Sequence, residues 1–337
     1  MRAFVITAPF KAEVQDVPAP IAKAGEVVVK IARVGICGTD VEFFNGSMPY
    51  LHDGQAKFPI RIGHEFTGTV VRVGDGVDSK WIGKRVVGDV MMGCGKCSRC
   101  TDGRQHTCQD RFEIGIRNGF DGALAEEMSI EPRFLLELPK EIDETLGALV
   151  EPGANSWRVA NAAQAAPGKR ILIFGTGTIA LMSAQFCIAM GAEVHMIGID
   201  PEQFPLALEV GAKSVNTEVQ SIAGGYHVVV DCTFDPSIPA KAVEIVEPGG
   251  RVVLIGVDDH AAPINSRLLV FRDITVVGIL SASPGLKHSI DFMKSGKVNL
   301  GKLVGATVGL DQAINIFNGK RPEGAGPGPK ILVDPSR

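Results

Sequence analysis

The chain has 337 residues, a length that fits two domains better than one. Hydrophobic residues make up 45% of it, which excludes a disordered chain, and its 40 glycines and 20 prolines indicate many turns. A net charge of -4, without a stripe of basic and aromatic residues, excludes nucleic acid as an expected partner.

The N-terminal residues give no sign of a targeting or membrane segment. Residues 1–6 alternate as a strand does and lack the apolar core of a secretory signal. The longest apolar helical stretch, residues 180–192, is interrupted by Ser183 and Gln185 and falls short of a bilayer span. We therefore expect a cytoplasmic protein. Seven cysteines in such a protein indicate metal binding or catalysis rather than disulfide bonds.

Up to about residue 133, short apolar runs separated by glycines predict an all-β, barrel-like unit. A dispersed set of metal-ligating residues begins there: Cys37 in Gly-Ile-Cys-Gly-Thr-Asp, His64 and Glu65 in Gly-His-Glu, and later Glu151 before a proline. A thiolate, an imidazole and one or two carboxylates suit a zinc that keeps one position open. Taken singly, a cysteine more often packs in a core and a His-Glu pair more often faces solvent. The residues alone therefore make this site a hypothesis.

A compact cysteine cluster follows, with the spacing C-x2-C-x2-C-x7-C and glycines in and around it. Four thiolates at this spacing can surround one ion, and glycines let the loop turn tightly enough to direct each sulfur inward. Because four protein ligands leave no open position, the metal is expected to be a structural zinc. Iron–sulfur ligation and incidental clustering are the alternatives. The four ligands are Cys94, Cys97, Cys100 and Cys108.

Residues 170–174 form an apolar run that leads directly into a turn of the form G-x-G-x-x-A and then into a helical stretch. The first glycine makes the turn, the second lets the backbone approach a pyrophosphate, and the third small residue lets the helix pack on the strand. Further apolar runs alternate with helical stretches, which predicts βαβ units around a parallel sheet. The residues expected at the cofactor are Gly175, Thr176, Gly177, Thr178 and Ile179.

An acidic residue usually follows about twenty positions after such a turn and binds the ribose hydroxyls. Here the next strand ends at Gly198, and Asp200 comes two residues later. Asp200 either accepts the ribose hydroxyls or caps a helix that begins near Pro201. The choice between NAD and NADP therefore stays open.

Over essentially its whole length the chain resembles the zinc-containing medium-chain dehydrogenase/reductase family, especially its polyol, sorbitol and threonine dehydrogenase branch. The resemblance is carried in chain order by residues 35–40, residues 63–65, the four-cysteine lobe, Glu151 with its proline, and residues 175–180. It implies an α/β plus β fold, with a Rossmann doubly wound parallel sheet inserted in a GroES-like β-barrel catalytic domain. The expected boundaries are residues 1–154 and 287–337 for the catalytic domain and 155–286 for the Rossmann domain, with a helix near residues 286–294.

Matching positions imply roles for the metal-ligating residues. Cys37 and His64 match catalytic zinc ligands, and Glu65 matches a ligand that exchanges with substrate or water. Glu151 matches the ligand of the polyol and threonine branch, where better-known alcohol dehydrogenases carry cysteine. It therefore favours polyols, sugar alcohols or other hydroxyl-rich secondary alcohols as substrates.

Further matches concern the proton path and the cofactor. Thr39 matches the hydroxyl residue that bonds the alcohol oxygen, and Asp40 the carboxylate that orients the histidine ligand. Glu42 stands where several relatives have histidine. Gly198 stands in place of the acidic residue that selects NAD, and no basic residue follows it to bind a 2′-phosphate.

The expected activity is zinc-dependent hydride transfer between an alcohol and NAD or NADP, with two zinc ions per chain. The resemblance also implies a homodimer or homotetramer paired through the edge strand at residues 274–279. One alternative is a zinc-dependent lyase, or a dismutase that keeps its nicotinamide bound. Another is a non-enzymatic dinucleotide-binding protein, which would have no need of an open metal site.

Overall fold

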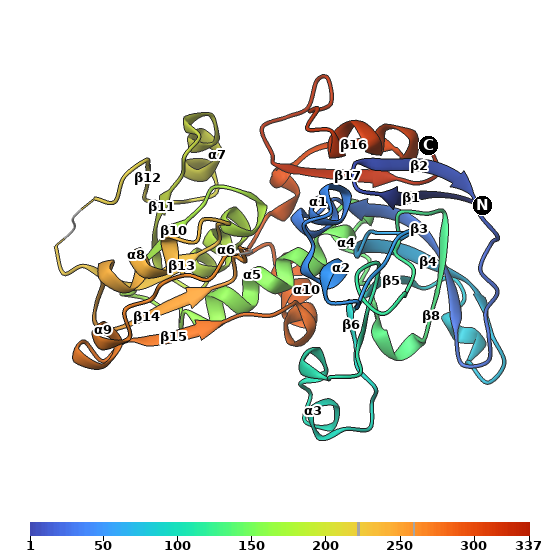
Figure 1. Cartoon of the computed structure of the whole chain (residues 1–337), viewed down its shortest axis with the longest axis horizontal. Coiled ribbons are helices and arrows are strands. Elements are labelled where there is room, and N and C mark those ends of the chain that lie inside the picture. The colour runs from blue at the N-terminus through green and yellow to red at the C-terminus, as the bar shows by residue number, and fades with distance from the viewer. Residues whose placement is uncertain (221–222, 259) are drawn as a thin grey trace. The chain divides into compact units, whose positions relative to one another are not determined.

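The computed structural model describes residues 1–220, 223–258 and 260–337. The chain divides into two compact units, and both chain ends lie in the first one (Figure 1). The first unit comprises Met1–Glu151, Ser289–Lys294 and Leu300–Arg337, and the second comprises Pro152–His288 and Ser295–Asn299. The sequence placed these boundaries at residues 154/155 and 286/287. The two compact units change over at residues 151/152 and 288/289, and the five residues Ser295–Asn299 return to the second unit.

The first unit is a β structure built from both ends of the chain. In its described residues, the main sheet runs in the order β16-β17-β3-β4-β5-β9, and β8 also pairs with β3. Two antiparallel pairs, β1 with β2 and β6 with β7, complete it. The strands are β1 Arg2–Ala8, β2 Lys11–Asp16, β3 Val27–Gly35, β4 Glu65–Val73, β5 Arg85–Gly88, β6 Met91–Met92, β7 Phe112–Glu113, β8 Glu127–Ile130, β9 Leu135–Glu137, β16 Val304–Gly309 and β17 Lys330–Asp334.

Alternating apolar residues explain this sheet, because one face of each strand enters a shared core. Phe4, Phe43, Phe44 and Phe66 are fully buried in that core. The ring of Phe4, near the N-terminus, stacks on that of Phe317 at a centroid distance of 5.2 Å, which ties the two ends of the chain together. The α-helices that lie wholly in this unit are short: α1 Gly38–Asn45, α2 Pro49–His52, α3 Ser98–Thr101, α4 Glu144–Ala148 and α11 Ala313–Phe317.

The second unit is a parallel sheet covered by helices. Its described strands lie in the order β12-β11-β10-β13-β14-β15, which is the 3-2-1-4-5-6 order of dinucleotide-binding folds. Ile171, Leu172 and Ile173 are completely buried, as expected for strands covered on both faces. The strands are β10 Arg170–Phe174, β11 Glu193–Ile197, β12 Ser214–Asn216, β13 Tyr226–Asp231, β14 Val246–Leu254 and β15 Thr275–Gly278. The helices are α6 Thr178–Ala189, α7 Phe204–Glu209, α8 Ile238–Ile245 and α9 Ser266–Phe271.

Two helices cross the boundaries between the units, α5 Val150–Ala162 and α10 Leu286–Lys294. The fold class predicted from the sequence is confirmed, and so are the strand at residues 170–174 and the helix at 286–294. Helix α5 and strands β16 and β17 were not predicted. There was no helix signal at α5 in the sequence, because Pro152 and Gly153 usually interrupt helices, although proline is tolerated in a helix's first turn.

Short 3-10 turns complete the structure: η1 Ser79–Trp81, η2 Gln105–Thr107, η3 Pro132–Phe134, η4 Pro201–Gln203, η5 Ser283–Gly285, η6 Leu300–Leu303 and η7 Leu310–Gln312.

No helix in the described parts of the chain is both long enough and apolar enough to cross a membrane.

Candidate metal and cofactor sites

Three of the four dispersed ligands come together where β3 ends and β4 begins. Cys37 follows β3 and precedes α1, His64 comes immediately before β4, and Glu65 is its first residue. The strands are antiparallel with Gly35 opposite Glu65, so the chain ends that carry these side chains meet. One ligand atom from each of the three residues lies within 4.8 Å of the others. A thiolate, an imidazole and a carboxylate at this separation fit a zinc ion.

Asp40 holds these ligands in place from the first turn of α1. The fully buried Asp40 carboxylate accepts hydrogen bonds from the backbone N–H of Cys37 at 2.9 Å and of Gly63 at 3.1 Å. Its Oδ1 lies 3.5 Å from Nδ1 of His64, an ion-pair separation rather than a good hydrogen bond. Burial alone would lower the pKa of His64, but Asp40 and Cys37 outweigh it and raise that pKa well above 6.5. With Nδ1 facing Asp40, Nε2 is the nitrogen that a metal would use.

Lys330, which the sequence did not single out, binds the carboxylate of Glu65. Its Nζ lies 2.7 Å from Oε2 and 3.0 Å from Oε1 of Glu65, and it donates to the carbonyl of Ile36 at 2.9 Å. Both side chains are buried, at 4% and 1% exposure. Gly35 makes room for this arrangement, because a Cβ there would come 2.1 Å from Glu65 Oε2. The only signal in the sequence is a lysine at the start of an apolar strand.

Two further residues were predicted for this site, Thr39 and Glu151. Thr39 is half-buried in the first turn of α1, between Cys37 and Asp40. Glu151 is buried in the first turn of α5, but it is not in the group whose ligand atoms lie within 4.8 Å of one another. The structure therefore assembles Cys37, His64 and Glu65, and it leaves Glu151 outside that group.

The four cysteines of the cluster form a compact group in the lobe that carries α3 (Figure 1). Sγ–Sγ distances are 3.6 Å for Cys97–Cys100, 3.8 Å for Cys97–Cys108 and 4.0 Å for Cys94–Cys100. Zinc–sulfur bonds of about 2.3 Å in a tetrahedron separate the sulfurs by about 3.8 Å. The spacing thus fits one tetrahedral zinc, and Gly93 permits it because a Cβ there would come 2.6 Å from Cys100 Sγ.

The pKa values of two of these thiols also favour a metal site. Backbone N–H groups of Lys96 and Cys97 lower the pKa of Cys94 to about 6. Desolvation, together with the neighbouring sulfurs, raises the pKa of Cys100 to about 12. The Cys94 thiolate therefore forms readily, whereas a thiolate at Cys100 needs a cation beside it. A metal ion among the four sulfurs would supply that cation.

The glycine-rich turn has the form that the sequence predicted. It joins β10 to α6, with Gly175 at φ 109° and Gly177 as the N-cap of α6. A Cβ on Gly177 would meet no atom within 4 Å, so the space beside its backbone is open to a ligand. A Cβ on Gly175 would lie 3.4 Å from the Cβ of Ala180, which is the close helix–strand approach that the small residue allows. The turn can hold a pyrophosphate at the helix N-terminus.

Gly198 and Asp200, the two residues predicted to lie at the ribose of the cofactor, follow β11 and have different surroundings. A Cβ on Gly198 would come 2.5 Å from Cγ2 of Thr176, so a side chain at that position would have to displace the Thr176 side chain. Asp200 is exposed and accepts a hydrogen bond from the backbone N–H of Glu202 at 3.0 Å. The capping role predicted for Asp200 is confirmed, since it is the N-cap of the turn at Pro201–Gln203. This bond uses Oδ1 of Asp200, and Oδ2 takes no part in it.

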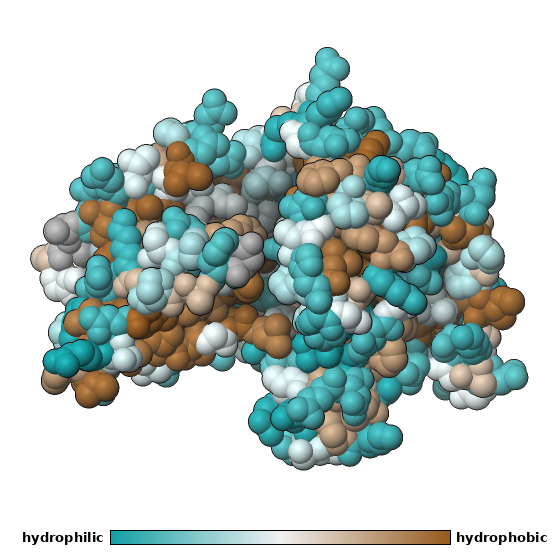
Figure 2. Space-filling view, in the orientation of Figure 1, coloured by the Kyte–Doolittle hydropathy of each residue, from teal (hydrophilic) through white to brown (hydrophobic). Residues whose placement is uncertain are grey.

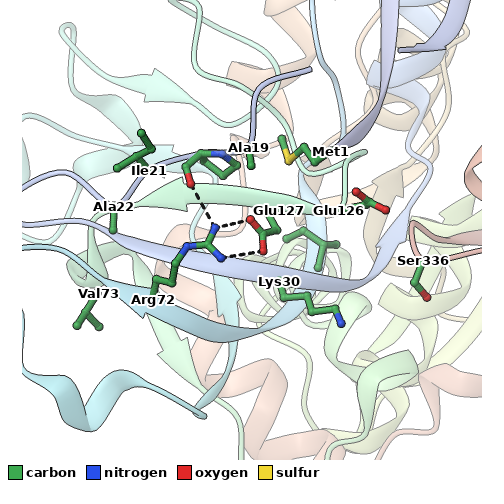
Figure 3. Close-up of a pocket in the computed structure, with 12 residues that line it drawn as sticks. Met1, Ala19, Ile21, Ala22, Lys30, Arg72, Val73, Glu126, Glu127 and Ser336 are labelled. Carbon is green, nitrogen blue, oxygen red and sulfur yellow. Dashed lines mark hydrogen bonds and ion pairs between the residues drawn. The ribbon is translucent and has the colours of Figure 1, made fainter. Parts of the chain in front are cut away.

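A groove of about 880 Å³ lies elsewhere on the first unit, between β3, β4 and the segment before β3. Among its charged lining residues, Arg72 is bonded to both carboxylate oxygens of Glu127 and to the carbonyl of Pro20 (Figure 3). Among the described residues that line it, none is a predicted metal or cofactor ligand. The groove is therefore separate from the chemistry considered above.

Comparison with known proteins gives consistent matches along the chain. Residues 23–140 match the family "Alcohol dehydrogenase GroES-like domain", and residues 178–295 match the family "Zinc-binding dehydrogenase". The chain is 30% identical over 296 residues to the zinc-type alcohol dehydrogenase-like protein YdjJ of Escherichia coli (strain K12), a match that covers 85% of each chain. It is 29% identical over 276 residues to L-threonine 3-dehydrogenase of Legionella pneumophila (strain Corby), covering 79% of this chain and 80% of that protein. A solved zinc-binding dehydrogenase from Sinorhizobium meliloti 1021, bound to NADP, matches over 99% of both chains with 27% identity and a TM-score of 0.88.

Proposed function

The chain belongs to the zinc-containing medium-chain dehydrogenase/reductase family, and on that premise we propose that it oxidises a hydroxyl-rich secondary alcohol with NAD as hydride acceptor. The observation that carries this proposal is the trio of Cys37, His64 and Glu65. Three ligands of this kind leave an open coordination position, in contrast to the closed four-cysteine cluster. A chain that only bound a dinucleotide would have no use for such a position.

The trio would hold a zinc whose contribution, when bound, is to polarise a hydroxyl and lower its pKa. This chain's own residues supply the rest. Asp40 orients the His64 ring, and the Thr39 hydroxyl accepts the hydrogen bond of the substrate hydroxyl and relays its proton to solvent water. Lys330 holds Glu65 by its carboxylate, which provides that side chain with a partner other than the metal. We further propose that Glu151, at the start of α5, becomes the third ligand beside Cys37 and His64 when Glu65 leaves the metal for Lys330, so that one position stays open to the alcohol.

For the cofactor we propose NAD in preference to NADP, with Asp200 as the acidic residue. Gly198 and Ile199 follow β11, so Asp200 carries the first acidic side chain after that strand. A carboxylate accepts hydrogen bonds from the two ribose hydroxyls and repels a 2′-phosphate. The relative from Sinorhizobium meliloti is bound to NADP, so this preference would be a property of the present chain.

For the substrate we propose a polyol, a sugar alcohol or a β-hydroxy amino acid. The relative from Legionella pneumophila is named for oxidation at carbon 3 of L-threonine, a secondary alcohol. Glu151 supports this class, because its carboxylate stands where alcohol dehydrogenases for simpler substrates carry cysteine. The lyase and dismutase alternatives find no support among these matches.

The test is a screen of polyols, sugar alcohols, L-threonine and simple alcohols with NAD and with NADP, following NADH or NADPH formation. We expect turnover of at least one hydroxyl-rich secondary alcohol with added NAD. Metal analysis of protein prepared without chelator should find two zinc ions per chain. Absence of any turnover that depends on added cofactor, with both zincs present, would contradict the proposal.

We also propose that the protein is a cytoplasmic homodimer or homotetramer that assembles through β15. In the described residues β15 pairs only with β14, so its other edge has free backbone groups. Figure 2 shows hydrophobic side chains gathered over β14, β15 and α9, where Val270 and Phe271 are 79% and 74% exposed. An apolar surface beside an open strand edge favours pairing with a second copy.

A further inference from the structure

Residues 111–118 contact separate parts of the first unit. The segment starts three residues after Cys108, the last ligand of the closed cluster, and it contains β7. The Nη1 atom of Arg111 donates to the carbonyl of Cys108 at 3.1 Å. Further along, Gly115 packs against the residue before His64, because a Cβ on Gly115 would come 3.0 Å from the backbone nitrogen of Gly63. One short segment therefore adjoins both the closed cluster and the open trio.

Arg111 makes three different bonds with three different nitrogens. Besides the bond to Cys108, its Nε donates to Oε1 of Glu113 at 2.7 Å and its Nη2 donates to the hydroxyl of Tyr50 at 3.2 Å. The Tyr50 hydroxyl in turn donates to Oε1 of Glu113 at 3.2 Å. The side chains of Arg111 and Glu113 are 13% and 3% exposed, so solvent screens this network little. A planar guanidinium places its donors on three separate nitrogens, whereas a lysine ammonium has all its donors on one nitrogen and cannot reach these three partners in the same directions.

Tyr50 belongs to α2, in a segment that continues from the helix beginning beside Cys37. We call residues 48–56 the α2 segment. The backbone N–H of Met48 donates to the carbonyl of Glu42 in α1, and that of Ala56 donates to the carbonyl of Tyr50 at 2.8 Å. A second tie joins this segment to residues 111–118, since the N–H of Asn118 donates to the carbonyl of Gln55 at 2.8 Å. The α2 segment is thus fixed from one side by the residues that follow the closed cluster.

We propose that Arg111 is a positioning residue that transmits the order of the closed cysteine cluster to Tyr50 and the α2 segment. The segment bonds to the carbonyl of Glu42 in α1, the helix that also carries Thr39, so its order in turn affects the binding of the alcohol at the Thr39 hydroxyl, a step that rests on the proposed function. A metal with four protein ligands cannot touch substrate. The order of its loop reaches the rest of the unit through contacts such as the bond between the Cys108 carbonyl and Arg111. A segment that is already held in one conformation adds no entropy cost of ordering when the substrate binds beside it.

The test compares Arg111→Lys, Tyr50→Phe and the double variant with wild type. Arg104→Lys is the matched control, because Arg104 lies in the same lobe in an exposed ion pair with Asp102. Hydrogen–deuterium exchange of residues 42–56 and zinc content are measured on every protein, independently of activity. Equilibrium binding of NADH by fluorescence and KM and kcat for the best alcohol of the wild-type screen complete the set.

We expect faster exchange in the α2 segment of Arg111→Lys, with two zinc ions per chain and unchanged NADH binding. KM should rise about three- to tenfold in each single variant, as for loss of one buried hydrogen bond, while kcat changes less. Because both residues act in one network, the double variant should be no worse than the more severe single variant. Arg104→Lys should behave as wild type.

Three results would overturn the proposal: unchanged exchange in the α2 segment of Arg111→Lys, multiplicative effects on KM in the double variant, or loss of a zinc ion from Arg111→Lys. The last would make Arg111 a residue of the metal site itself. If the wild type oxidises no alcohol, the proposed function fails, whereas the exchange and zinc measurements still decide whether Arg111 orders the α2 segment.

Discussion

Replacing Lys330 with methionine tests the buried pair beside the open trio. The change keeps the apolar stem but removes the ammonium that lies 2.7 Å and 3.0 Å from the two carboxylate oxygens of Glu65. Glu65 is 1% exposed, so its charge would lose its cation without gaining water. Removing one partner of a buried ion pair destabilises a protein by about 3–5 kcal/mol. We expect the metal-free variant to lose about that much free energy of unfolding in the transition of the first unit.

The measurement is urea unfolding of metal-free and zinc-loaded protein, with the transition of each unit followed separately. The zinc-loaded variant should lose less, because a cation beside Glu65 replaces part of the lost attraction. The double variant Lys330→Met/Glu65→Gln removes both charges and should recover much of the loss. A change of less than about 1 kcal/mol in the metal-free Lys330→Met variant, the range of exposed ion pairs, would refute the reasoning.

The same pair predicts a dependence on alkaline pH. Burial alone would lower the pKa of Lys330, but the charges of Glu65 and Cys37 outweigh it and raise that pKa above its usual value of 10.5. A raised pKa of a cationic group stabilises the folded state fully below the unfolded pKa, and this stabilisation disappears as the pH rises through the folded pKa. Above pH 10.5 the wild type should therefore lose stability more steeply than Lys330→Met in parallel unfolding titrations.

Four further predictions concern the metal lobe, the cofactor, the proton path and assembly. Cys97→Ser should lower solubility or unfolding temperature far more than it lowers kcat of the folded fraction, because a closed metal site contributes its binding energy to folding; normal folding with lost turnover would contradict this. Asp200→Asn, which keeps the capping oxygen, should raise the ratio of kcat/KM for NADP over NAD by about tenfold or more in steady-state kinetics, since the charge that repels a 2′-phosphate is gone; an unchanged ratio would exclude Asp200 from the ribose site. Thr39→Val should lower turnover roughly a hundredfold with zinc and NADH binding retained, and Thr39→Ser should recover most of it; a wild-type rate, where a deuterium isotope effect shows hydride transfer to be rate-limiting, would remove Thr39 from the proton path. Light scattering should give a dimer or tetramer, and a monomer would contradict pairing through β15.

Much of the fold could be predicted because its signals are local. The run at residues 170–174 is apolar throughout, as a strand buried on both faces must be, and its glycine turn marks the start of α6. Helix α5 was not predicted because Pro152 and Gly153 are usually helix breakers. Both lie in its first turn, where neither residue prevents a helix. Strand β17 follows a Gly/Pro-rich stretch and pairs with β3, near the other end of the sequence. Such pairing is set by tertiary contacts, which no short window of sequence contains.

The candidate sites divide in the same way between local and distant information. Metal ligands are visible in a sequence because few residue types bind zinc and because their spacing is set by short loops, as in the four-cysteine cluster. The residues that position those ligands carry no such mark. Lys330 is 265 positions from Glu65, and a lysine at the start of an apolar strand is also common where the strand lies at the surface. Arg111 is one of several arginines in its lobe, and only its three bonds distinguish it. Candidate ligands can thus be proposed from the sequence. The second partner of such a residue, as Lys330 is for Glu65, depends on which strands are neighbours in the folded sheet.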